Sequence, residues 1–135
     1  MTPGDVNWLA IVLATLASMA LGMAWYTVLS KQWMSAVGKS VEDIKQEGSA
    51  TPFVWAALAQ LVIAYFMAFL MPRIIGDTSI YSGLLTGAHM WVGFVITAMI
   101  INHRYQGQRW SLTFIDGGYL LGALLVQGVV IGAFG

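Results

Sequence analysis

Residues 6–30 read VNWLAIVLATLASMALGMAWYTVLS, a run of 25 positions without Asp, Glu, Lys or Arg. About 20 apolar residues are enough for a helix to cross the hydrocarbon core of a membrane. A lone strand in lipid would leave backbone groups unpaired, and the run lacks the alternating polarity of a membrane barrel. It also lacks the basic start and the short apolar core of a cleavable signal peptide. We therefore expect this stretch to be a membrane-spanning helix.

Three further charge-free runs follow the first one. They cover residues 48–72, 78–103 and 117–135, with lengths of 25, 26 and 19 residues. Together with the first run, these three accommodate four helices of membrane-spanning length, and a fifth does not fit. The sequence thus predicts an all-α membrane protein, a bundle of four transmembrane helices in a single domain over 1–135. We place the spans at about 6–29, 53–72, 80–102 and 112–134.

The composition excludes several other classes of protein. Hydrophobic residues make up 59% of the chain and charged residues 9%, and six basic and six acidic residues give a net charge of zero. A nucleic-acid binder needs clustered Lys and Arg, and a disordered chain needs many more polar residues. The absence of cysteine excludes a disulfide scaffold and a thiol nucleophile. We expect the lipid bilayer as a partner, and no nucleic acid.

The Lys and Arg residues predict the orientation in the membrane. Loop 30–52 contains three of them and loop 103–111 contains two, whereas loop 73–79 contains one and the N-terminal tail none. Short loops rich in Lys and Arg stay in the cytoplasm. We therefore expect a multi-pass protein of the cell (plasma or inner) membrane, with both termini outside.

The connection between the first two spans has a pattern of its own. Ser40 and Asp43 have the spacing of a capping box, directly after Gly38. Apolar residues recur around them at 3-4-3 spacing, which is typical of one face of a helix. We expect one or two short amphipathic helices on the inner membrane surface. The apolar stripe consists of Met34, Val37, Val41 and Ile44.

Aromatic residues gather near the ends of the predicted spans. We interpret them as a belt at the membrane–water interface rather than as a cage for a ligand. On the outer side, next to Asp5, we expect Asn7 to cap the first helix. The belt residues are Trp8, Trp25, Tyr26, Trp33, Phe53, Trp55, Tyr105 and Trp110.

Three stretches resemble one known family. They are VNWLAIVLATLASMALGMAWYTVLSKQWM at 6–34, GLLTGAHMWVGFV at 83–95 and IDGGYLLGALLVQGVVIGA at 115–133. In this order, and over nearly the whole chain, they resemble the bacterial and fungal integral membrane family called domain of unknown function 1761. The resemblance implies about four membrane helices and, because the family has no assigned activity, no mechanism. The most specific elements are Asn7-Trp8, Trp25-Tyr26 followed by Trp33, Ile115-Asp116 and Gly118-Tyr119.

Polar side chains within the spans are the candidates for function, since each must find a partner or water. His89, Gln60 and Ser18 fall near the membrane midplane by their positions in the spans. We expect them to form an interior polar line that binds or passes a small molecule. His89 either relays protons, as an imidazole can near neutral pH, or stays neutral and hydrogen-bonds to Gln60, to Ser18 or to a backbone carbonyl between helices. We favour the structural role, because no acidic residue lies near His89 in the sequence.

Asp116 is the only formal charge inside a predicted span. It lies about one turn from the inner end of its helix, where the helix dipole stabilises a carboxylate. We expect Asp116 to be a structural anchor paired with Arg109 or Lys31. The alternative is a carboxylate that binds a proton or cation during transport.

The sequence contains no pattern for metal or covalent chemistry. His103 lies fourteen residues from His89, about 21 Å along a helix, so the two cannot hold one metal ion or haem within one chain. Serine, histidine and acidic residues do not occur in a catalytic spacing. We expect no enzyme, no metal and no cofactor.

Glycines recur every four positions on the last predicted helix. Such spacing lets helices approach closely in lipid. Gln127 lies on the same helix and could hydrogen-bond to its symmetry mate in a closed oligomer. We therefore expect these glycines to form a helix-packing face, and we expect this face to join the chains of a small homo-oligomer. The pairs are Gly118 with Gly122 and Gly128 with Gly132.

The sequence favours a non-enzymatic membrane protein of unknown specific activity that binds or passes a small molecule. The alternative is a compact proton-coupled exporter, similar in size to the small multidrug resistance transporters. Those transporters depend on an acidic residue in the first helix, and residues 6–30 contain none. A membrane enzyme or cofactor carrier is a third class, for which the sequence offers no motif.

Overall fold

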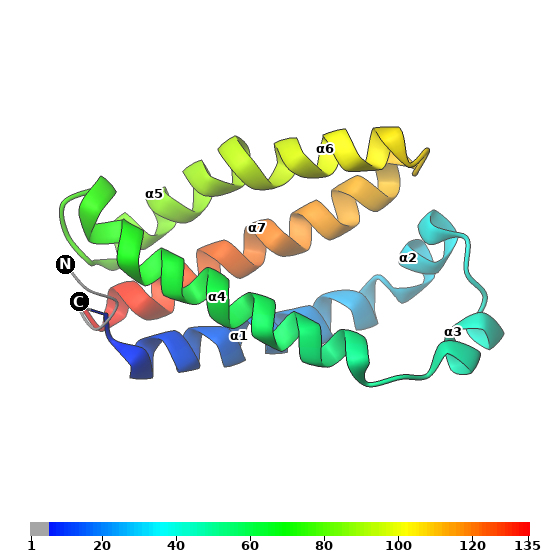
Figure 1. Cartoon of the computed structure of the whole chain (residues 1–135), viewed down its shortest axis with the longest axis horizontal. Helices are drawn as coiled ribbons and strands as arrows, with labels where there is room; N and C mark the ends of the chain where they lie inside the picture. Colours follow the sequence, from blue (N-terminus) through cyan, green and yellow to red (C-terminus); the bar gives the residue numbers. More distant parts are fainter. Residues whose placement is uncertain (1–5) are drawn as a thin grey trace.

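The computed structural model describes residues 6–135 and contains four long helical rods that lie side by side (Figure 1). The first two are α1 (Trp8–Val28) and α4 (Thr51–Ile74), and the last is α7 (Trp110–Ala133). The third runs through α5 (Ile80–Met90), the π-helix η1 (Trp91–Val95) and α6 (Ile96–Tyr105). All four are long and apolar enough to cross a membrane, and residues 6–135 contain no strand. The predicted all-α fold, with four helices long and apolar enough to span a membrane, is confirmed.

The first span begins as expected. The Asn7 side chain accepts a hydrogen bond from the backbone N–H of Ala10 at 3.1 Å, so Asn7 caps α1. Asp5, which we expected beside this cap, lies outside the described residues.

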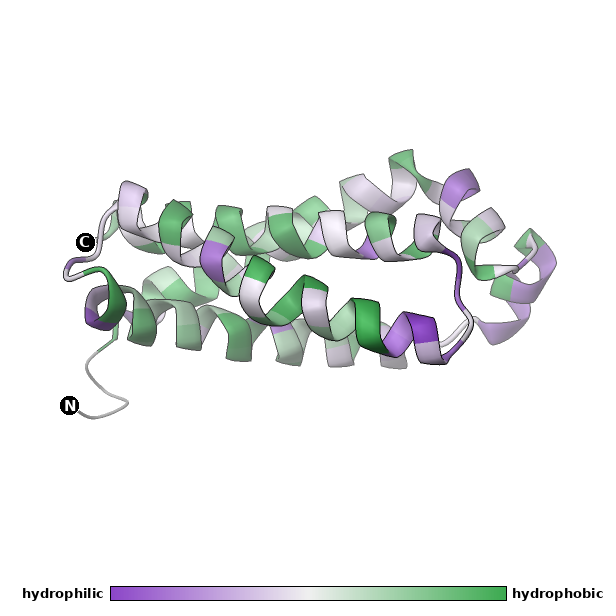
Figure 2. Ribbon diagram, turned by 90° about the horizontal axis from the view of Figure 1, so that it is seen from above, coloured by the Kyte–Doolittle hydropathy of each residue, from purple (hydrophilic) through white to green (hydrophobic). Residues whose placement is uncertain are grey.

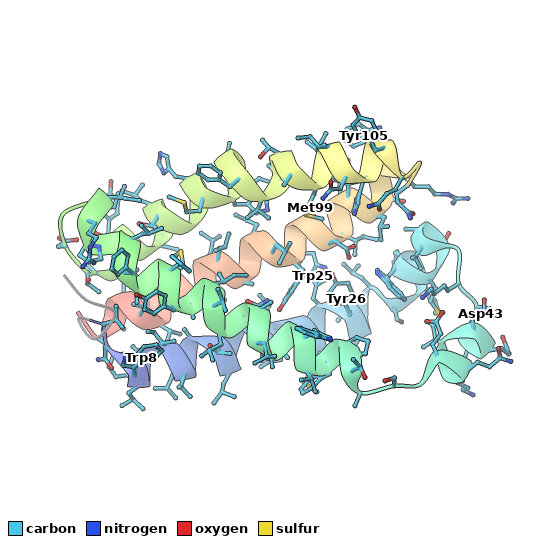
Figure 3. All side chains as sticks on the ribbon, viewed as in Figure 1. Trp8, Trp25, Tyr26, Asp43, Met99 and Tyr105 are labelled. Atoms are coloured by element: carbon cyan, nitrogen blue, oxygen red, sulfur yellow. The ribbon has the colours of Figure 1, made fainter. Side chains whose placement is uncertain are left out.

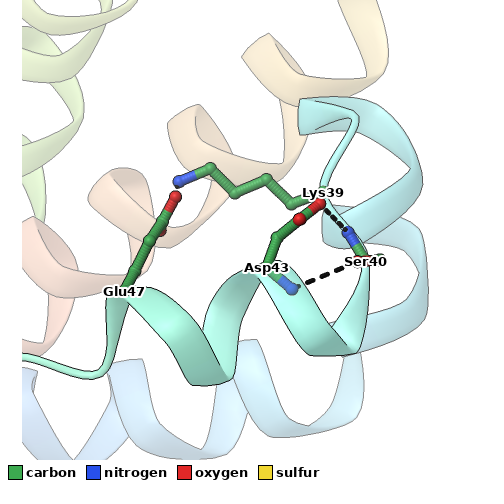
Figure 4. A network of polar contacts seen from close by, with 4 residues as sticks. All are labelled: Lys39, Ser40, Asp43 and Glu47. Carbon is green, nitrogen blue, oxygen red and sulfur yellow. Dashed lines mark hydrogen bonds and ion pairs between the residues drawn. The ribbon is translucent and has the colours of Figure 1, made fainter.

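The connection between α1 and α4 forms two short helices, α2 (Ser30–Val37) and α3 (Val41–Glu47). Gly38 ends α2 with a φ of 78°, a left-handed conformation that favours glycine. The Ser40 hydroxyl accepts from the Asp43 N–H at 3.1 Å, and the Asp43 carboxylate accepts from the Ser40 N–H at 2.9 Å (Figure 4). The predicted capping box is therefore confirmed. Figure 2 shows that hydrophilic residues gather at this end of the molecule.

Helix α7 is central, because α1, α4 and α5 all pack against it. Its contact with α5 brings backbone against backbone. A Cβ atom at Gly83 or Gly128 would collide with the backbone of the other glycine, and one at Gly132 would collide with the backbone of Ser79. In lipid, such close approach supplies much of the attraction between helices. These glycines therefore join α5 and α7 within one chain.

The predicted helix-packing face on α7 makes its contacts within one chain, and the predicted contact between chains is not needed to cover it. Nearer the start of the helix, a Cβ atom at Gly118 would lie 3.0 Å from the Trp25 ring, and one at Gly122 would lie 2.9 Å from Leu21. All four candidate glycines thus pack within the chain, and Gln127 is fully buried. The reason is the central position of α7, whose small residues are already covered by α1 and α5.

The apolar core occupies the half of the bundle away from α2 and α3. Trp8 stacks on Tyr65 there, with ring centroids 5.6 Å apart. In the other half, α4 and α6 diverge on either side of α7 (Figure 1). The side chains there leave a cavity, while the tightly packed end holds the helices together. The buried core residues are Ala10, Ile11, Ala14, Ala64, Met67, Ala68, Met71, Leu124 and Ile131.

Candidate ligand-binding site

A cavity of about 730 Å³ lies in the half of the bundle next to α2 and α3. Its wall is drawn from α1, α2, α3, α4, α6 and α7, so residues far apart in the sequence meet there. In Figure 3, the side chains of Trp25 and Tyr26 project from α1 into the space between α4 and α7. The polar and aromatic lining residues are Tyr26, Ser30, Trp33, Gln60, Asp116 and Tyr119, and the apolar ones are Met34, Ile44, Ala56, Ala59, Ile63, Met99 and Leu120.

Asp116 lines this cavity and is half-buried. One of its carboxylate oxygens accepts a hydrogen bond from the Tyr26 hydroxyl at 2.7 Å, across 90 residues of sequence. Among the residues that the structure describes, neither Arg109 nor Lys31 forms an ion pair with Asp116. The predicted partner of Asp116 is therefore wrong. The partner is a neutral hydroxyl, because α1 presents Tyr26 to the face of α7 that carries the carboxylate.

Two indole rings fix the backbone on either side of Asp116. Trp25 donates its Nε1–H to the carbonyl of Ile115 at 3.0 Å, and Trp91 donates to the carbonyl of Gly117 at 2.8 Å. The first indole comes from α1 and the second from η1, the π-helical segment of the third rod. Such segments are frequent at functional sites. Together the indoles hold the turn of α7 that directs Asp116 toward the cavity.

A chain of hydrogen bonds leads from the cavity into the bundle. The Tyr119 hydroxyl accepts from Gln60 Nε2 at 2.8 Å and donates to the Ser18 carbonyl at 2.9 Å. Gln127 donates its Nε2 to Gln60 Oε1 at 2.9 Å and to Ser18 Oγ at 3.1 Å. Gln60 and Ser18 are thus brought together, joined by two residues that we did not place in the polar line. The Oε1 atom of Gln127 is buried without a hydrogen-bond partner within residues 6–135.

His89 does not belong to this polar line. It is exposed, and its Nδ1 atom lies 2.8 Å from the carbonyl of Leu85 on its own helix. The interior position that we expected for His89 is therefore wrong. Gly87 faces α7, and His89 lies about 200° around the helix from Gly87 at 3.6 residues per turn. The glycine contact turns the imidazole away from the bundle.

A second cavity, of about 270 Å³, adjoins the first. It shares Gln60, Ile63 and Leu120 with the larger cavity and extends between α4 and the third rod. Its remaining lining residues are apolar: Val62, Phe66, Met67, Leu70, Met90, Phe94, Val95, Ala123 and Leu124. The larger cavity, whose wall contains a few polar groups, therefore adjoins one that is almost wholly apolar.

The aromatic belt needs a partial revision. Tyr26 and Trp33 line the cavity, and the centroid of the Tyr26 ring lies 6.4 Å from that of Trp33 and 5.5 Å from that of Tyr119. Tyr119 is a site residue that our sequence analysis missed, although it lies one turn after Asp116 on the same helix face. Five other aromatic residues are exposed, as an interface belt requires: Trp8, Phe53, Trp55, Tyr105 and Trp110.

Four apolar rods around a buried polar network define this chain as a multi-span membrane protein. It matches the family described as "Protein of unknown function (DUF1761)" over residues 9–132, and it belongs to that family. The resemblance in the sequence is therefore confirmed. No curated protein and no solved structure matches the chain.

Proposed function

We propose that this protein is a non-enzymatic membrane protein that binds a small amphiphilic molecule in the larger cavity. The observation that carries the proposal is the composition of the cavity wall, where a half-buried carboxylate and polar side chains stand among apolar ones. Binding sites for small molecules are mostly apolar, with a few polar groups that fix the orientation of the ligand. The adjoining apolar cavity gives the tail of such a ligand a place to lie.

The location and the absence of catalysis belong to the same proposal. The Lys and Arg distribution supports a place in the cell membrane with α2 and α3 at the cytoplasmic side. Among the described residues that line the cavity, the titratable side chains are those of Asp116, Tyr26 and Tyr119. This set supports binding better than hydrolysis, which needs an activated nucleophile or metal-bound water. A homo-oligomer stays a prediction, and the proposed site needs one chain only.

Filling the cavity tests the proposal. Ala59 lines the cavity, whereas its neighbour Leu58 is 50% exposed and does not. We expect Ala59→Phe to abolish binding of a neutral amphiphile, dodecyldimethylphosphine oxide, and Leu58→Phe to preserve it. Binding would be measured on protein in nanodiscs of an uncharged galactolipid, with protein-free nanodiscs subtracted. If the wild type binds no more probe than Ala59→Phe does, the proposed site does not exist.

A proton-coupled exporter is the second candidate, and one observation favours it. Asp116, the carboxylate that lies within a span, faces the cavity that would hold the cargo. A carboxylate in that place can exchange a proton for a bound molecule. In proteoliposomes, an exporter would accumulate amphiphile when a pH gradient is imposed, and Asp116→Asn would abolish the accumulation. Binding without any gradient-driven accumulation would exclude this candidate.

A further inference from the structure

We propose that the occupant of the larger cavity is an organic cation, whose positive head lies between Asp116 and the rings of Tyr26 and Trp33. This inference rests on the proposed function and deepens it by assigning a charge and a head-group class to the ligand. Three independent features of the cavity support it: its charge, its aromatic rings and its apolar extension.

The formal charge among the side chains that line the cavity is that of one carboxyl group. Asp116 provides this group, and no Lys, Arg or His is among the described residues that line the cavity. Tyr26 satisfies one carboxylate oxygen, and Asp116 has no ion-pair partner in residues 6–135. The Nδ1 atom of His103 lies 2.7 Å from Thr113 Oγ1, and His103 does not line the cavity. A carboxylate at membrane depth is costly without a partner, and a cationic ligand supplies one.

The aromatic rings around the carboxylate suit the same ligand. The Tyr26 ring meets the Trp33 ring at 86° and the Tyr119 ring at 63°, and all three line the cavity. Rings set at steep angles form a corner that presents π-faces in several directions. Such corners attract ammonium-type cations, and Trp gives the strongest contact. An anionic head would meet the repulsion of Asp116 in the same place.

The apolar extension defines the rest of the ligand. From Asp116, the wall passes through Gln60 to Ile63 and Leu120, and these three residues also line the second cavity. A chain that follows this path lies between α4 and η1, among Phe94 and Val95. The ligand class is therefore a small cationic head attached to an apolar body.

A matched pair of probes tests the charge without any change to the protein. Dodecyltrimethylammonium and dodecyldimethylphosphine oxide have the same tail and heads of similar size, but only the first is charged. In uncharged galactolipid nanodiscs, we expect the wild type to bind the ammonium probe at least about tenfold more tightly, a ratio equal to about 1.4 kcal/mol. Equal or weaker binding of the ammonium probe would overturn the inference, while binding of the neutral probe would leave the proposed function intact. Binding of neither probe would overturn both.

Two variants then locate the charge and the rings. Asp116→Asn keeps an oxygen that accepts from Tyr26, and we expect it to remove the preference for the ammonium probe while neutral binding persists. Trp33→Leu should reduce ammonium binding about threefold or more, which a lost cation–π contact accounts for. Glu42→Gln is the matched control, because Glu42 is an exposed carboxylate on α3 that does not line the cavity. An unchanged preference in Asp116→Asn, with the fold intact by thermal melting, would contradict the assignment.

Discussion

Asp116 places a carboxylate inside a membrane-spanning rod, so its hydrogen bonds bear directly on stability. The Tyr26 hydroxyl and the backbone held by Trp25 and Trp91 fix its position. A hydrogen bond to a charged group is stronger than one between neutral groups. The loss in free energy of unfolding when the Tyr26 hydroxyl is removed therefore depends on whether the carboxylate of Asp116 is present.

The first prediction concerns this pair. We expect Tyr26→Phe to lower the free energy of unfolding by about 1–2 kcal/mol, because the carboxylate loses its donor. In a double-mutant cycle with Asp116→Ala, the two effects should be less than additive by about 1 kcal/mol. The measurement is denaturant unfolding in micelles.

Arg109→Gln is the control. Its effect on the free energy of unfolding should add to that of Asp116→Ala without coupling, since no ion pair joins these residues in the described chain. Coupling to Arg109 in place of Tyr26 would restore the ion pair that the sequence suggested.

The second prediction concerns Gln60, which is buried and hydrogen-bonds to Tyr119 and Gln127. Gln60→Leu removes partners from both residues at once, so we expect a loss of about 1–2 kcal/mol in the same unfolding assay. Adding Gln127→Leu should lower the free energy of unfolding little further, because the Gln127 amide that lost its partner is then removed as well. Gln46→Leu, at an exposed position of α3, should change little. Fully additive losses would mean that the two glutamines do not form one network.

At the scale of the helices, the length of each span was predictable from the sequence, but the rotation of each helix about its own axis was not. Each span is visible in the sequence because it contains a long charge-free run, which the membrane demands; in α7 that run begins directly after Asp116. The side of a helix that faces inward depends on contacts with other helices, such as Gly87 with Leu124. That contact turned His89 outward, and contacts of the same kind buried Gln127. Asp116, Tyr119 and Gln127 lie at i, i+3 and i+11 on one face of α7. The sequence contains this pattern, but only the packing of Tyr26 against that face shows that the pattern forms part of a site.

The third prediction tests the backbone contact between α5 and α7. We expect Gly128→Ala to destabilise the bundle by about 1–3 kcal/mol, because its methyl group would collide with the Gly83 backbone. Gly93→Ala is the control, since nothing lies within 4 Å of a Cβ atom there. It should change stability by less than about 1 kcal/mol. Thermal melting of both variants in the same micelles makes the comparison. Equal effects would show that the helices do not touch at Gly128.

The fourth prediction concerns helix α3. Hydrogen bonding by the Ser40 backbone, and then by the Ser40 side chain, lowers the pKa of the Asp43 carboxyl below its ordinary value. A carboxyl group whose pKa is lower in the folded state than in the unfolded state stabilises the folded state at a pH above the ordinary pKa. This stabilisation is lost as the pH falls through the lowered pKa of the folded state. We expect NMR titration to show α3 fraying only below about pH 4. Ser40→Ala should raise the pKa of Asp43 and shift fraying to higher pH. A pKa of Asp43 at or above its ordinary value would mean that the capping box does not form.

At the scale of the whole molecule, the two halves of the bundle differ. One half contains the apolar core and the glycine contacts of α5 with α7, and the other contains the cavities and the short helices α2 and α3. The packed half keeps the rods together, so the other half can stay open to a ligand without unfolding the chain. A cavity next to α2 and α3 faces the side of the membrane on which these helices lie, so orientation decides from which side the polar end is reached.

The last prediction concerns that orientation. The α2–α3 segment lies in the loop with three Lys residues, which predicts a cytoplasmic position. Because the chain contains no cysteine, single cysteines can be introduced one at a time. Gln46→Cys, at an exposed position of α3 without a capping role, should react with an impermeant thiol reagent only after the membrane is opened. Thr78→Cys, in the turn between α4 and α5, should react in intact cells, because the two positions lie at opposite ends of α4. Labelling of Gln46→Cys in intact cells, with Thr78→Cys protected, would mean that the topology is inverted and that the polar end of the cavity lies at the outer surface. Labelling of both positions in intact cells would mean that the chain inserts in two orientations.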